Sequence, residues 1–582
     1  MQKKLTFFLA TLLVLSIPAF ALAAKPVLFF SDLTSGPNTG WAGSSAMGVA
    51  VSILGENFGG AIRGTNYVTV NGAQLDSNSN YAEWDTSGTA NGIPRGLERI
   101  TFWVPSNAAS GAGNITVTIN GVTSNALPFT VRQGNIYFIS VADGKDSYSG
   151  KLTASNGTDG PWKDIYMIAS NNNPIIRPGD TIYVRGGTYT TLDPSNQGMF
   201  VDFRNVANVS GTASAPYAVA SYPGEIAELN GSNANRGFTY VDSGSPFYVN
   251  YWTFSKFLYV NGYNAFNLTG NYNRVVGNHF QNLLNSDWSG VVWATDAQHT
   301  SIDGNYFDHC GYDKYKHDIY IKTQNTYGGS GDIAVQNTDI GWNEFYNTVS
   351  SNGYGGVVLV SHSGDSNVAG LVTDYTYIHD NYFHAGNEGD FLYLGDGSAP
   401  NNSVDNTYVY NNIFSGGTAS SNGGVSIDSG VAHLYFYNNT FYQIASANLP
   451  VFDYFGSGTT LSSVNNIYYN YSGQTIFNSG GWWTSGYDLF FNSGTPSGAA
   501  NALNANPQFV SPGSDFHLQS SSPAINAGTT IALVATDYDA IPRPQGTAYC
   551  RGAYEYPSGS GSGGGGTTTT EIPSAPTNLT VQ

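Results

Sequence analysis

In the second half of the chain, polar and hydrophobic positions alternate in one recurring pattern, an Asn followed two places later by an aromatic residue. The steps between successive Asn residues are 27, 38, 38, 31, 27 and 27. Repeats of about this length are typical of stacked units, none of which can bury its apolar face alone. The seven occurrences are Asn278-His279-Phe280, Asn305-Tyr306-Phe307, Asn343-Glu344-Phe345, Asn381-Tyr382-Phe383, Asn412-Ile413-Phe414, Asn439-Thr440-Phe441 and Asn466-Ile467-Tyr468.

Each repeat also carries a short run rich in β-formers, such as residues 318–322, and no helical pattern separates these runs. We therefore predict an all-β chain dominated by a parallel β-solenoid with one turn per repeat. We expect the Asn at a corner, because Asn tolerates left-handed backbone angles. Its side chain should hydrogen-bond to the Asn residues ~4.8 Å above and below, and the aromatic residue should lie in the core.

The N-terminus indicates export. Lys3 and Lys4 precede an apolar run from Leu5 to Ile17, and small residues follow at 21–23, as in a secretory signal spanning 1–24. We expect a secreted or cell-surface bacterial protein. The formal net charge is −19, which argues against nucleic acid as a partner and is compatible with bound divalent cations. We expect Cys310 and Cys550 to be small buried residues; a bridge between them is the less favoured alternative.

Residues 25–132 show alternating runs at 49–53, 67–70, 100–104 and 115–119, with turn signals at Asn71-Gly72 and Asn120-Gly121. The string 51–59 (VSILGENFG) and the closing 125–131 (NALPFTV) resemble the IPT/TIG family of immunoglobulin-like domains. This resemblance implies a small immunoglobulin-like β-sandwich. Such modules usually act as spacers or binding units, and we expect this one to be non-catalytic.

The segments at 136–140, 160–163 and 177–189 resemble the opening of right-handed parallel β-helix proteins of the pectin lyase-like superfamily. The resemblance covers about 134–556 and implies a right-handed parallel β-helix, with 159–169 as a short capping helix and 507–556 as the last coil and C-terminal cap. It does not imply one activity, because the superfamily includes lyases, hydrolases, isomerases, adhesins and phage tailspikes. A Gly/Thr-rich linker at 557–572 follows, and 573–582 resembles the first strand of a fibronectin type III domain.

Three consecutive repeats are longer than the others, and the extra residues fall at one place, just after the β-rich run. They form the segments 323–339, 361–374 and 395–405. Insertions on one face of a repeat stack usually build a binding surface, so we expect a groove along the helix axis.

Aligning the repeats on Val291, Ile319, Val357, Phe391, Val425 and Phe452 predicts which side chains point outward beneath these insertions, because side chains alternate along a strand. The expected outward positions are Tyr320, Val358 and Leu392; Lys322, Val360 and Leu394; and Gln324, His362 and Asp396. The apolar members are expected to be covered by the inserted loops or, alternatively, to form a platform for a sugar.

In polysaccharide lyases of this superfamily, a Lys or Arg commonly abstracts the proton next to a uronate carboxylate while Ca²⁺ held by acidic side chains neutralises that carboxylate. Lys322 is the only Lys at the expected outward positions, which makes it the candidate base, with His362 beside it. Asp332, Asp365 and Asp396 offer the hard oxygen ligands that Ca²⁺ prefers. We further nominate Tyr320, Gln324 and His317 for substrate contact, although the polar cluster at 309–318 is also expected to be a solvated charged turn.

The sequence therefore favours a secreted carbohydrate-active protein that binds an acidic polysaccharide, and it leaves open whether the protein also cleaves it by β-elimination, since no lyase motif surrounds Lys322. A non-catalytic adhesion or matrix protein is the alternative. A glycoside hydrolase using paired carboxylates such as Asp396 and Asp428 ranks third, because no polygalacturonase-type motif is visible.

Overall fold

The computed structural model describes residues 25–60, 64–86, 96–169, 176–194, 198–203, 210–232, 237, 248–283, 289–311, 316–326, 331–348, 356–384, 390–416, 424–444, 449–478 and 480–557. The predicted signal, the linker beyond residue 557 and the fibronectin-like segment lie outside them. Within these ranges the chain is almost entirely β, with short 3₁₀ turns η1(Trp41–Gly43), η2(Asn78–Asn80), η4(Ile165–Ile168) and η5(Ser366–Val368). No helix in the described ranges is long and apolar enough to span a membrane.

The N-terminal unit consists of two small, mainly antiparallel sheets that enclose a core of Val, Ile, Leu and Phe side chains. One sheet has the order β1(Val27–Ser31), β3(Met47–Glu56), β7(Glu98–Pro105), β6(Tyr81–Asp85). The other has the order β2(Ser35–Gly36), β10(Leu127–Val131), β8(Gly111–Ile119), β4(Tyr67–Val70), β5(Ala73–Leu75), and β9(Val122–Thr123) pairs with β8. The sheets fit the expected β-sandwich, whereas membership of the IPT/TIG family stays a prediction.

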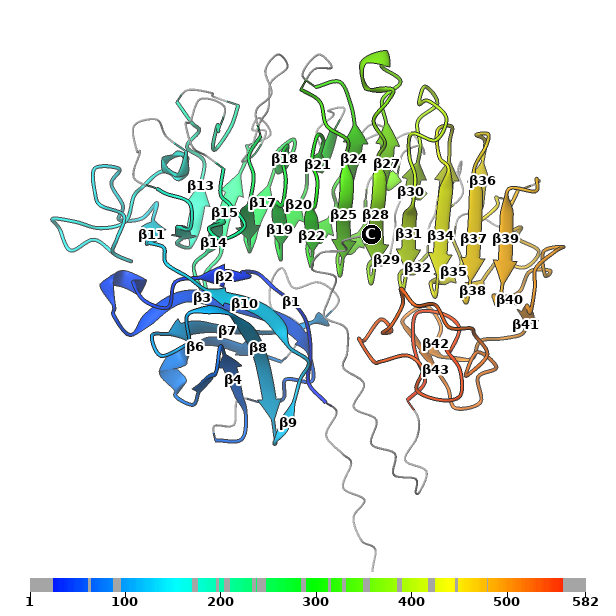
Figure 1. Cartoon of the computed structure of the whole chain (residues 1–582), viewed down its shortest axis with the longest axis horizontal. Coiled ribbons are helices and arrows are strands. Elements are labelled where there is room, and N and C mark those ends of the chain that lie inside the picture. The colour runs from blue at the N-terminus through cyan, green and yellow to red at the C-terminus, as the bar shows by residue number, and fades with distance from the viewer. Residues whose placement is uncertain are drawn as a thin grey trace, which may run out of the picture.

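The rest of the chain winds into the predicted parallel β-helix, drawn from cyan to orange in Figure 1. Its three parallel sheets are called here sheets I, II and III. Sheet I contains β11(Ile136–Ile139), β12(Thr181–Val184), β14(Tyr217–Ser221), β16(Trp252–Ser255), β19(Arg274–Val276), β22(Ser301–Asp303), β25(Gln336–Gly341), β28(Asp374–His379), β31(Thr407–Tyr410), β34(His433–Tyr437), β37(Thr460–Val464) and β39(Trp483–Gly486).

Among the described residues, a sheet II strand follows each sheet I strand from β12 to β39, and a sheet III strand follows sheet II in seven coils. Sheet II contains β13(Gly187–Tyr189), β15(Ala227–Asn230), β17(Phe257–Val260), β20(His279–Gln281), β23(Tyr306–Asp308), β26(Glu344–Tyr346), β29(Tyr382–His384), β32(Ile413–Ser415), β35(Thr440–Tyr442), β38(Ile467–Tyr469), β40(Leu489–Phe491) and β41(Leu503–Asn504). Sheet III contains β18(Phe266–Leu268), β21(Ser289–Ala294), β24(Lys316–Thr323), β27(Gly356–His362), β30(Asp390–Leu394), β33(Val425–Ile427) and β36(Phe452–Tyr454).

The Asn-x-aromatic repeat lies at the corner between sheets I and II. Its aromatic side chains stack in the core, as predicted: the ring centroids of Phe345 and Phe383 are 4.5 Å apart, and those of Phe383 and Phe414 are 4.8 Å apart. The Asn side chains form a buried ladder in which, from Asn305 onward, each amide oxygen accepts from the preceding Asn. Asn305 Nδ2 donates to Asn343 Oδ1 at 3.0 Å, and Asn343 Nδ2 donates to Asn381 Oδ1 at 3.0 Å.

The left-handed residue of this corner is the one before each ladder Asn, so the predicted reason for Asn was wrong. Positive φ angles occur at Gly277, Gly304, Trp342, Asp380, Asn411, Asn438 and Asn465, and at none of the seven ladder residues. Hydrogen bonding between coils, rather than tolerance of a left-handed backbone, therefore explains the recurring Asn. The ladder ends at Asp488, whose Oδ1 accepts from Asn466 N at 2.7 Å.

The solenoid is covered at its N-terminal end and along one side, so the segment expected as a C-terminal cap lies against sheet II. The expected helix at 159–169 is reduced to η4, which brings Ile165 and Ile168 on to the core beside Trp162. The segment from β42(Phe509–Ser511) and β43(Asp515–Leu518) to Tyr556 folds back against sheet II, where it packs with Ile413, Ile467 and Leu489. Its two-stranded sheet lies below the solenoid in Figure 1. Cys310 and Cys550 are both free and buried, as predicted.

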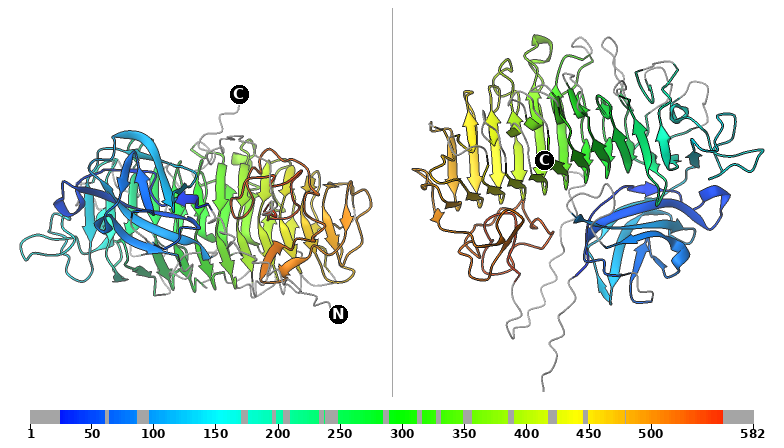
Figure 2. Two further views of the ribbon diagram at one scale, coloured as in Figure 1. Left: turned by 90° about the horizontal axis from the view of Figure 1, so that it is seen from below. Right: turned by 180° about the vertical axis from the view of Figure 1, so that it is seen from behind.

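The N-terminal unit is docked on the solenoid. The hydroxyl group of Tyr183 in β12 donates to Ala50 O at 2.8 Å, and Lys256 forms an ion pair of 2.8 Å with the buried carboxylate of Asp32. Arg274 donates to the carbonyl oxygens of Ser31 and Asp32 at 2.9 and 2.8 Å. Figure 2 shows this unit and the C-terminal segment on the same side of the β-helix.

Candidate functional site

The three insertions connect sheet III to sheet I in neighbouring coils, as the sequence predicted. They run from β24 to β25, from β27 to β28 and from β30 to β31, and the corresponding connections from β21, β33 and β36 are short turns. In Figure 1 these loops rise above the solenoid on the side away from the N-terminal unit. The outer face of sheet III beside them is the candidate site.

The predicted facing of sheet III was wrong by one residue in two coils. Ile319 pairs with Val358 and Leu392, not with Val357 and Phe391, so Val358, Val360, Leu392 and Leu394 point inward and are fully buried. Two consecutive buried residues at the start of a strand, such as Phe391 and Leu392, interrupt the alternation on which the prediction relied. A shift of one residue moves every following side chain to the other face. The aligned outward residues are Tyr320, Leu359 and Tyr393 in one row, with Lys322 and Ser361 in the next.

Lys322 lies on the outer face, as predicted, and reaches across one coil to Asp396. Its Nζ is 3.0 Å from Asp396 Oδ2, and 16% of its side chain is exposed. Partial burial lowers the pKa of Lys322, but the neighbouring Tyr320 and Asp396 outweigh it, so the pKa lies above its usual value. Lys322 is therefore a cation at neutral pH, and its free amine appears only under alkaline conditions.

Aromatic and acidic side chains flank this pair. The Tyr320 ring centroid is 5.8 Å from Lys322 Nζ, and the Tyr393 hydroxyl group donates to Asp428 Oδ2 at 2.9 Å. Burial, with Asp428 next in order, raises the pKa of Tyr393, so this hydroxyl group stays protonated. Phe455, 53% exposed, lies beside Tyr393 with the ring centroids 6.2 Å apart. Together they give a surface with apolar rings, one cation and two carboxylates.

The structure places His362 away from this surface. His362 pairs with Thr323, is fully buried, and its Nδ1 lies 2.6 Å from Ser363 O. Burial lowers the pKa of His362, so its ring is neutral and shielded from a ligand. Gln324 is half-buried just beyond the end of β24.

His317 lies at the other end of β24, with Nδ1 2.7 Å from Gly356 O and its ring centroid 5.3 Å from that of Tyr320. Lys316, His317 and Asp318 are 2%, 5% and 0% exposed. The expected solvated turn is therefore wrong for these three residues. Burial raises the pKa of Asp318 to about 7.

The three predicted Ca²⁺ ligands each have separate partners. Asp365 accepts from Asn325 Nδ2 at 2.8 Å and Asp332 from Thr326 N at 2.9 Å, whereas Asp396 binds Lys322 and Ser398. Within the described ranges, no group of three or more His, Cys, Asp or Glu residues is arranged to hold a metal ion. The residues do not fit a preformed Ca²⁺ site.

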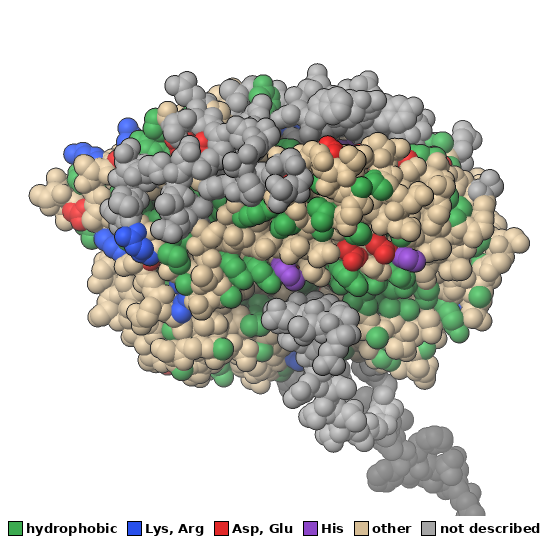
Figure 3. Space-filling model, turned by 45° about the horizontal axis from the view of Figure 1, so that its top comes forward, with side chains coloured by type: hydrophobic (Ala, Val, Ile, Leu, Met, Phe, Trp, Pro, Cys, Tyr) green, Lys and Arg blue, Asp and Glu red, His purple; other side chains and the backbone are tan. Residues whose placement is uncertain are grey.

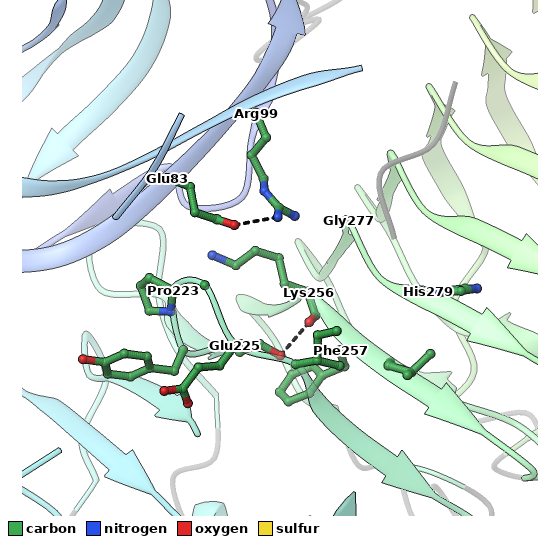
Figure 4. A pocket seen from close by; sticks show the side chains of 13 residues that line it. Glu83, Arg99, Pro223, Glu225, Lys256, Phe257, Gly277 and His279 are labelled. Atoms are coloured by element: carbon green, nitrogen blue, oxygen red, sulfur yellow. Dashed lines mark hydrogen bonds and ion pairs between the residues drawn. The ribbon is translucent and has the colours of Figure 1, made fainter. Parts of the chain in front are cut away.

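A cavity of about 240 Å³ lies between the N-terminal unit and the solenoid. Figure 4 shows Glu83 and Arg99 entering from the N-terminal sheets, with Lys256 extending between them and Phe257. Arg99 binds Glu83 at 2.8 Å and Lys256 binds Asp32 at 2.8 Å, so the charges here are already paired. The cavity belongs to the domain junction, and no local sequence pattern could have revealed it.

The fold and this surface define a parallel β-helix protein with three neighbouring inserted loops beside sheet III. A scan of family models finds no match. Over 134 residues the chain is 29% identical to the pectate lyase PEL9 of Emericella nidulans, a match that covers 21% of this chain and 27% of that protein. It therefore spans about a quarter of the length of this relative.

Solved structures with similar coordinates are all distant in sequence. A pectate lyase named Pel9A has 16% identity and a TM-score of 0.44, with 73% of this chain and 96% of that one covered. The Family 28 exopolygalacturonase of Yersinia enterocolitica has 8% identity and a TM-score of 0.33, with 83% and 100% covered. The PL6 family alginate lyase AlyGC has 13% identity and a TM-score of 0.26, with 60% and 53% covered. None of these likenesses carries information about the substrate.

Three residues of the surface were missed from the sequence: Tyr393 was not among the predicted outward positions, Phe455 was not considered, and Asp428 was considered only for hydrolysis. The correct register would have predicted that Tyr393 points outward, because Tyr320, Leu359 and Tyr393 occupy one row of sheet III. Asp428 and Phe455 lie in coils without an insertion, so the lengths of the repeats gave no indication that these two residues belong to the site.

Proposed function

We propose that the outer face of sheet III binds an exported or extracellular acidic polysaccharide, with Lys322 as the cation that meets a sugar carboxylate. The observation that carries this proposal is the position of Lys322 on the outer face of sheet III, where its Nζ lies 5.8 Å from the Tyr320 ring centroid and 3.0 Å from Asp396. A cation held beside aromatic rings suits a sugar acid, because the carboxylate needs a counter-charge and the ring hydrogens pack on apolar surface.

The acidic surroundings impose a condition on this binding. The charge of Lys322 is already neutralised by Asp396. A second carboxylate, that of Asp428, lies next to Gly397, the residue after Asp396: its Oδ2 is 3.4 Å from the position that a Cβ atom on Gly397 would occupy. A polyanion is repelled by such a surface unless a cation intervenes. Asp396 and Asp428 could share a Ca²⁺ only with carboxylates of the polymer as further ligands. Polymer binding should therefore require Ca²⁺, and Ca²⁺ without polymer should leave the melting temperature unchanged.

The test compares Lys322→Gln with wild type in affinity electrophoresis through gels containing polygalacturonate, alginate or a glycosaminoglycan, with Ca²⁺ or with chelator. We expect Lys322→Gln to weaken binding at least tenfold, because one charge-assisted contact of the kind described above contributes about 1.5–3 kcal/mol. Lys163→Gln, which changes an exposed Lys at the far end of the solenoid, should bind as wild type does. Equal retardation of wild type and Lys322→Gln would overturn the proposal.

The similarity to a pectate lyase favours β-elimination as the reaction on the bound polymer. In such a step Lys322, as free amine, would take the proton next to the carboxylate, and the glycosidic oxygen on the neighbouring carbon would leave to give an unsaturated sugar. Because the pKa of Lys322 lies above its usual 10.5, the rate should still be rising with pH throughout the range below that value, and it should vanish in Lys322→Gln. Absorbance of unsaturated products measures it; binding without such products would leave a non-catalytic polysaccharide-binding protein.

A further inference from the structure

Sheet I carries a second ordered surface, on the other side of the inserted loops from Lys322. Tyr377 in β28, Tyr408 in β31 and Tyr435 in β34 occupy one outward row in three successive coils. Their ring centroids are 5.3 and 4.6 Å apart, and both interplanar angles are 10°. All three side chains are partly exposed. The term tyrosine strip is used here for these three residues.

The hydroxyl groups of the strip are free to meet a ligand. Among the described residues, none of the three has a hydrogen-bond partner for its hydroxyl group. Burial raises the pKa of Tyr377 and of Tyr408 to about 12, so the groups are protonated and can both donate and accept. Because the rings cover each other's faces, a ligand meets a row of ring edges and hydroxyl groups, one per coil.

The row of the strip continues through Asp339, Ser301 and Arg274, whereas further aromatic residues lie in a neighbouring row two positions earlier. At the corner that leads into sheet I, Tyr251, Tyr272 and His299 stack with centroids 4.7 and 4.5 Å apart, and Tyr272 is 39% exposed. Tyr375 occupies the same corner position next to the strip, with a φ of 53°, whereas the neighbouring coils have Asn337 and Asn406 there. A bulky side chain in the left-handed region is strained where Asn is not. The strain indicates that the ring of Tyr375 is retained for a contact.

The charge around the strip indicates which ligand it suits. No Lys or Arg occurs between residues 323 and 542, so the three coils that carry the strip offer no Lys or Arg of their own to a polyanion. The acidic neighbours already have hydrogen-bond partners: Asp374 accepts from Asn406 Nδ2 at 3.0 Å, and Asp405 lies 2.7 Å from His433 Nδ1. In Figure 3 red and purple side chains lie beside a green area at mid-molecule, and blue ones gather toward one end.

We propose that the tyrosine strip is a second glycan-binding surface, specific for a neutral, linear polysaccharide whose chain lies along the solenoid axis. Repeated hydroxyl groups and ring edges, spaced by the ~4.8 Å rise of the coils, match a polymer with hydroxyl groups on every sugar unit. The surface is distinct from the site at Lys322, because sheets I and III are separated by the inserted loops. Surface aromatic groups of this kind commonly serve recognition.

The experiment is a pull-down of the full chain on insoluble neutral glycans (cellulose, xylan, mannan and β-1,3-glucan), followed by affinity electrophoresis on the soluble forms. We expect at least one neutral glycan to retain the wild type, and Tyr408→Ala to weaken that retention at least tenfold. Tyr408→Phe, which keeps the stacked ring, should lie between the two. Tyr346→Ala removes a partly exposed Tyr from sheet II and should bind as wild type does.

The outcomes separate this surface from the site at Lys322. Lys322→Gln should keep full binding to the neutral glycan, so failure of the acidic-polysaccharide proposal leaves this test intact. The melting temperature of Tyr408→Ala shows whether it is folded; Tyr375→Asn, which adopts the residue of the neighbouring coils, should be at least as stable as wild type and bind less. No retention on any neutral glycan, or equal retention of wild type, Tyr408→Ala and Tyr375→Asn, overturns the proposal.

Discussion

Each ladder Asn uses every polar atom of its amide. Asn343 Oδ1 accepts from both the backbone N and the side-chain Nδ2 of Asn305, at 2.8 and 3.0 Å. Its own Nδ2 donates to Ile302 O at 2.8 Å and to Asn381 Oδ1. Asn343 is fully buried, so none of these groups can turn to water when the side chain is removed.

Asn343→Ala should lower the free energy of unfolding by about 1–3 kcal/mol, because it leaves buried groups of neighbouring coils without partners. Chemical denaturation with fluorescence detection measures the loss. Asn401→Ala, which alters an exposed residue in the connection from β30 to β31, is the control and should change stability by less than about 0.5 kcal/mol. Equal midpoints for the two variants would mean that the ladder does not stabilise the solenoid.

At the scale of the strand, one face of β24 contributes to the core and the other face belongs to the candidate binding surface. Ile319 and Ile321 point into the core and are fully buried, while Tyr320 and Lys322 point outward and are half-buried. Hydrogen bonding along the whole strand sets the register of β24 with β27 and β30, so each side chain of β24 faces either the core or the outer surface. Stability should therefore depend on one set of positions and ligand binding on the other.

Ile321→Ala should cost about 2–5 kcal/mol, as expected for truncating a fully buried Ile. Tyr320→Ala should cost less than half of that and should weaken binding of the acidic polysaccharide. Thermal melts and affinity electrophoresis on the two variants give both quantities. A larger loss of stability in Tyr320→Ala than in Ile321→Ala would mean that the register described here is incorrect.

At the scale of the whole molecule, the N-terminal unit and the solenoid share one buried interface. The core of the N-terminal sheets includes Phe138 and Tyr183 from the first coils, and Trp41 packs against both rings at 5.2 and 4.8 Å. Farther along the solenoid, the ring centroids of Phe30 and Trp342 lie 5.5 Å apart. The unit is a fixed part of the molecule, not the flexibly tethered spacer that a modular layout suggests.

Asp32→Ala should weaken this interface strongly, because it leaves the ammonium group of Lys256 largely buried without its partner. Breaking a buried pair from one side costs about 3–5 kcal/mol. Calorimetry of the wild type should show the N-terminal unit and the solenoid unfolding together, and Asp32→Ala should split this transition. Glu83→Ala is the control: it breaks the ion pair of Glu83 with Arg99, which lies within the N-terminal unit and is more exposed than the pair of Asp32 with Lys256. This variant should still unfold in one transition. A single unshifted transition in Asp32→Ala would show that the interface does not depend on this pair.

The spacing of Asn278, Asn305, Asn343 and their successors determined the parallel β-helix by itself, because coils stack only when equivalent residues recur at equivalent places. The same spacing located the three insertions and the outward Lys322, whereas the ion pair between Lys322 and Asp396 came only from the structure. These are properties of a local repeat, which one sequence displays without reference to any distant residue.

Only the tertiary structure decided which side chains share a surface. The two buried residues at the start of β27 and β30 shifted the facing of His362 and Tyr393, because register depends on the neighbouring strands and not on distance from the Asn corner. The tyrosine strip and the pairing of Lys256 with Asp32 join residues far apart in the chain. Such contacts depend on how the coils and the domains pack against each other, and the spacing of the sequence repeat does not determine this packing.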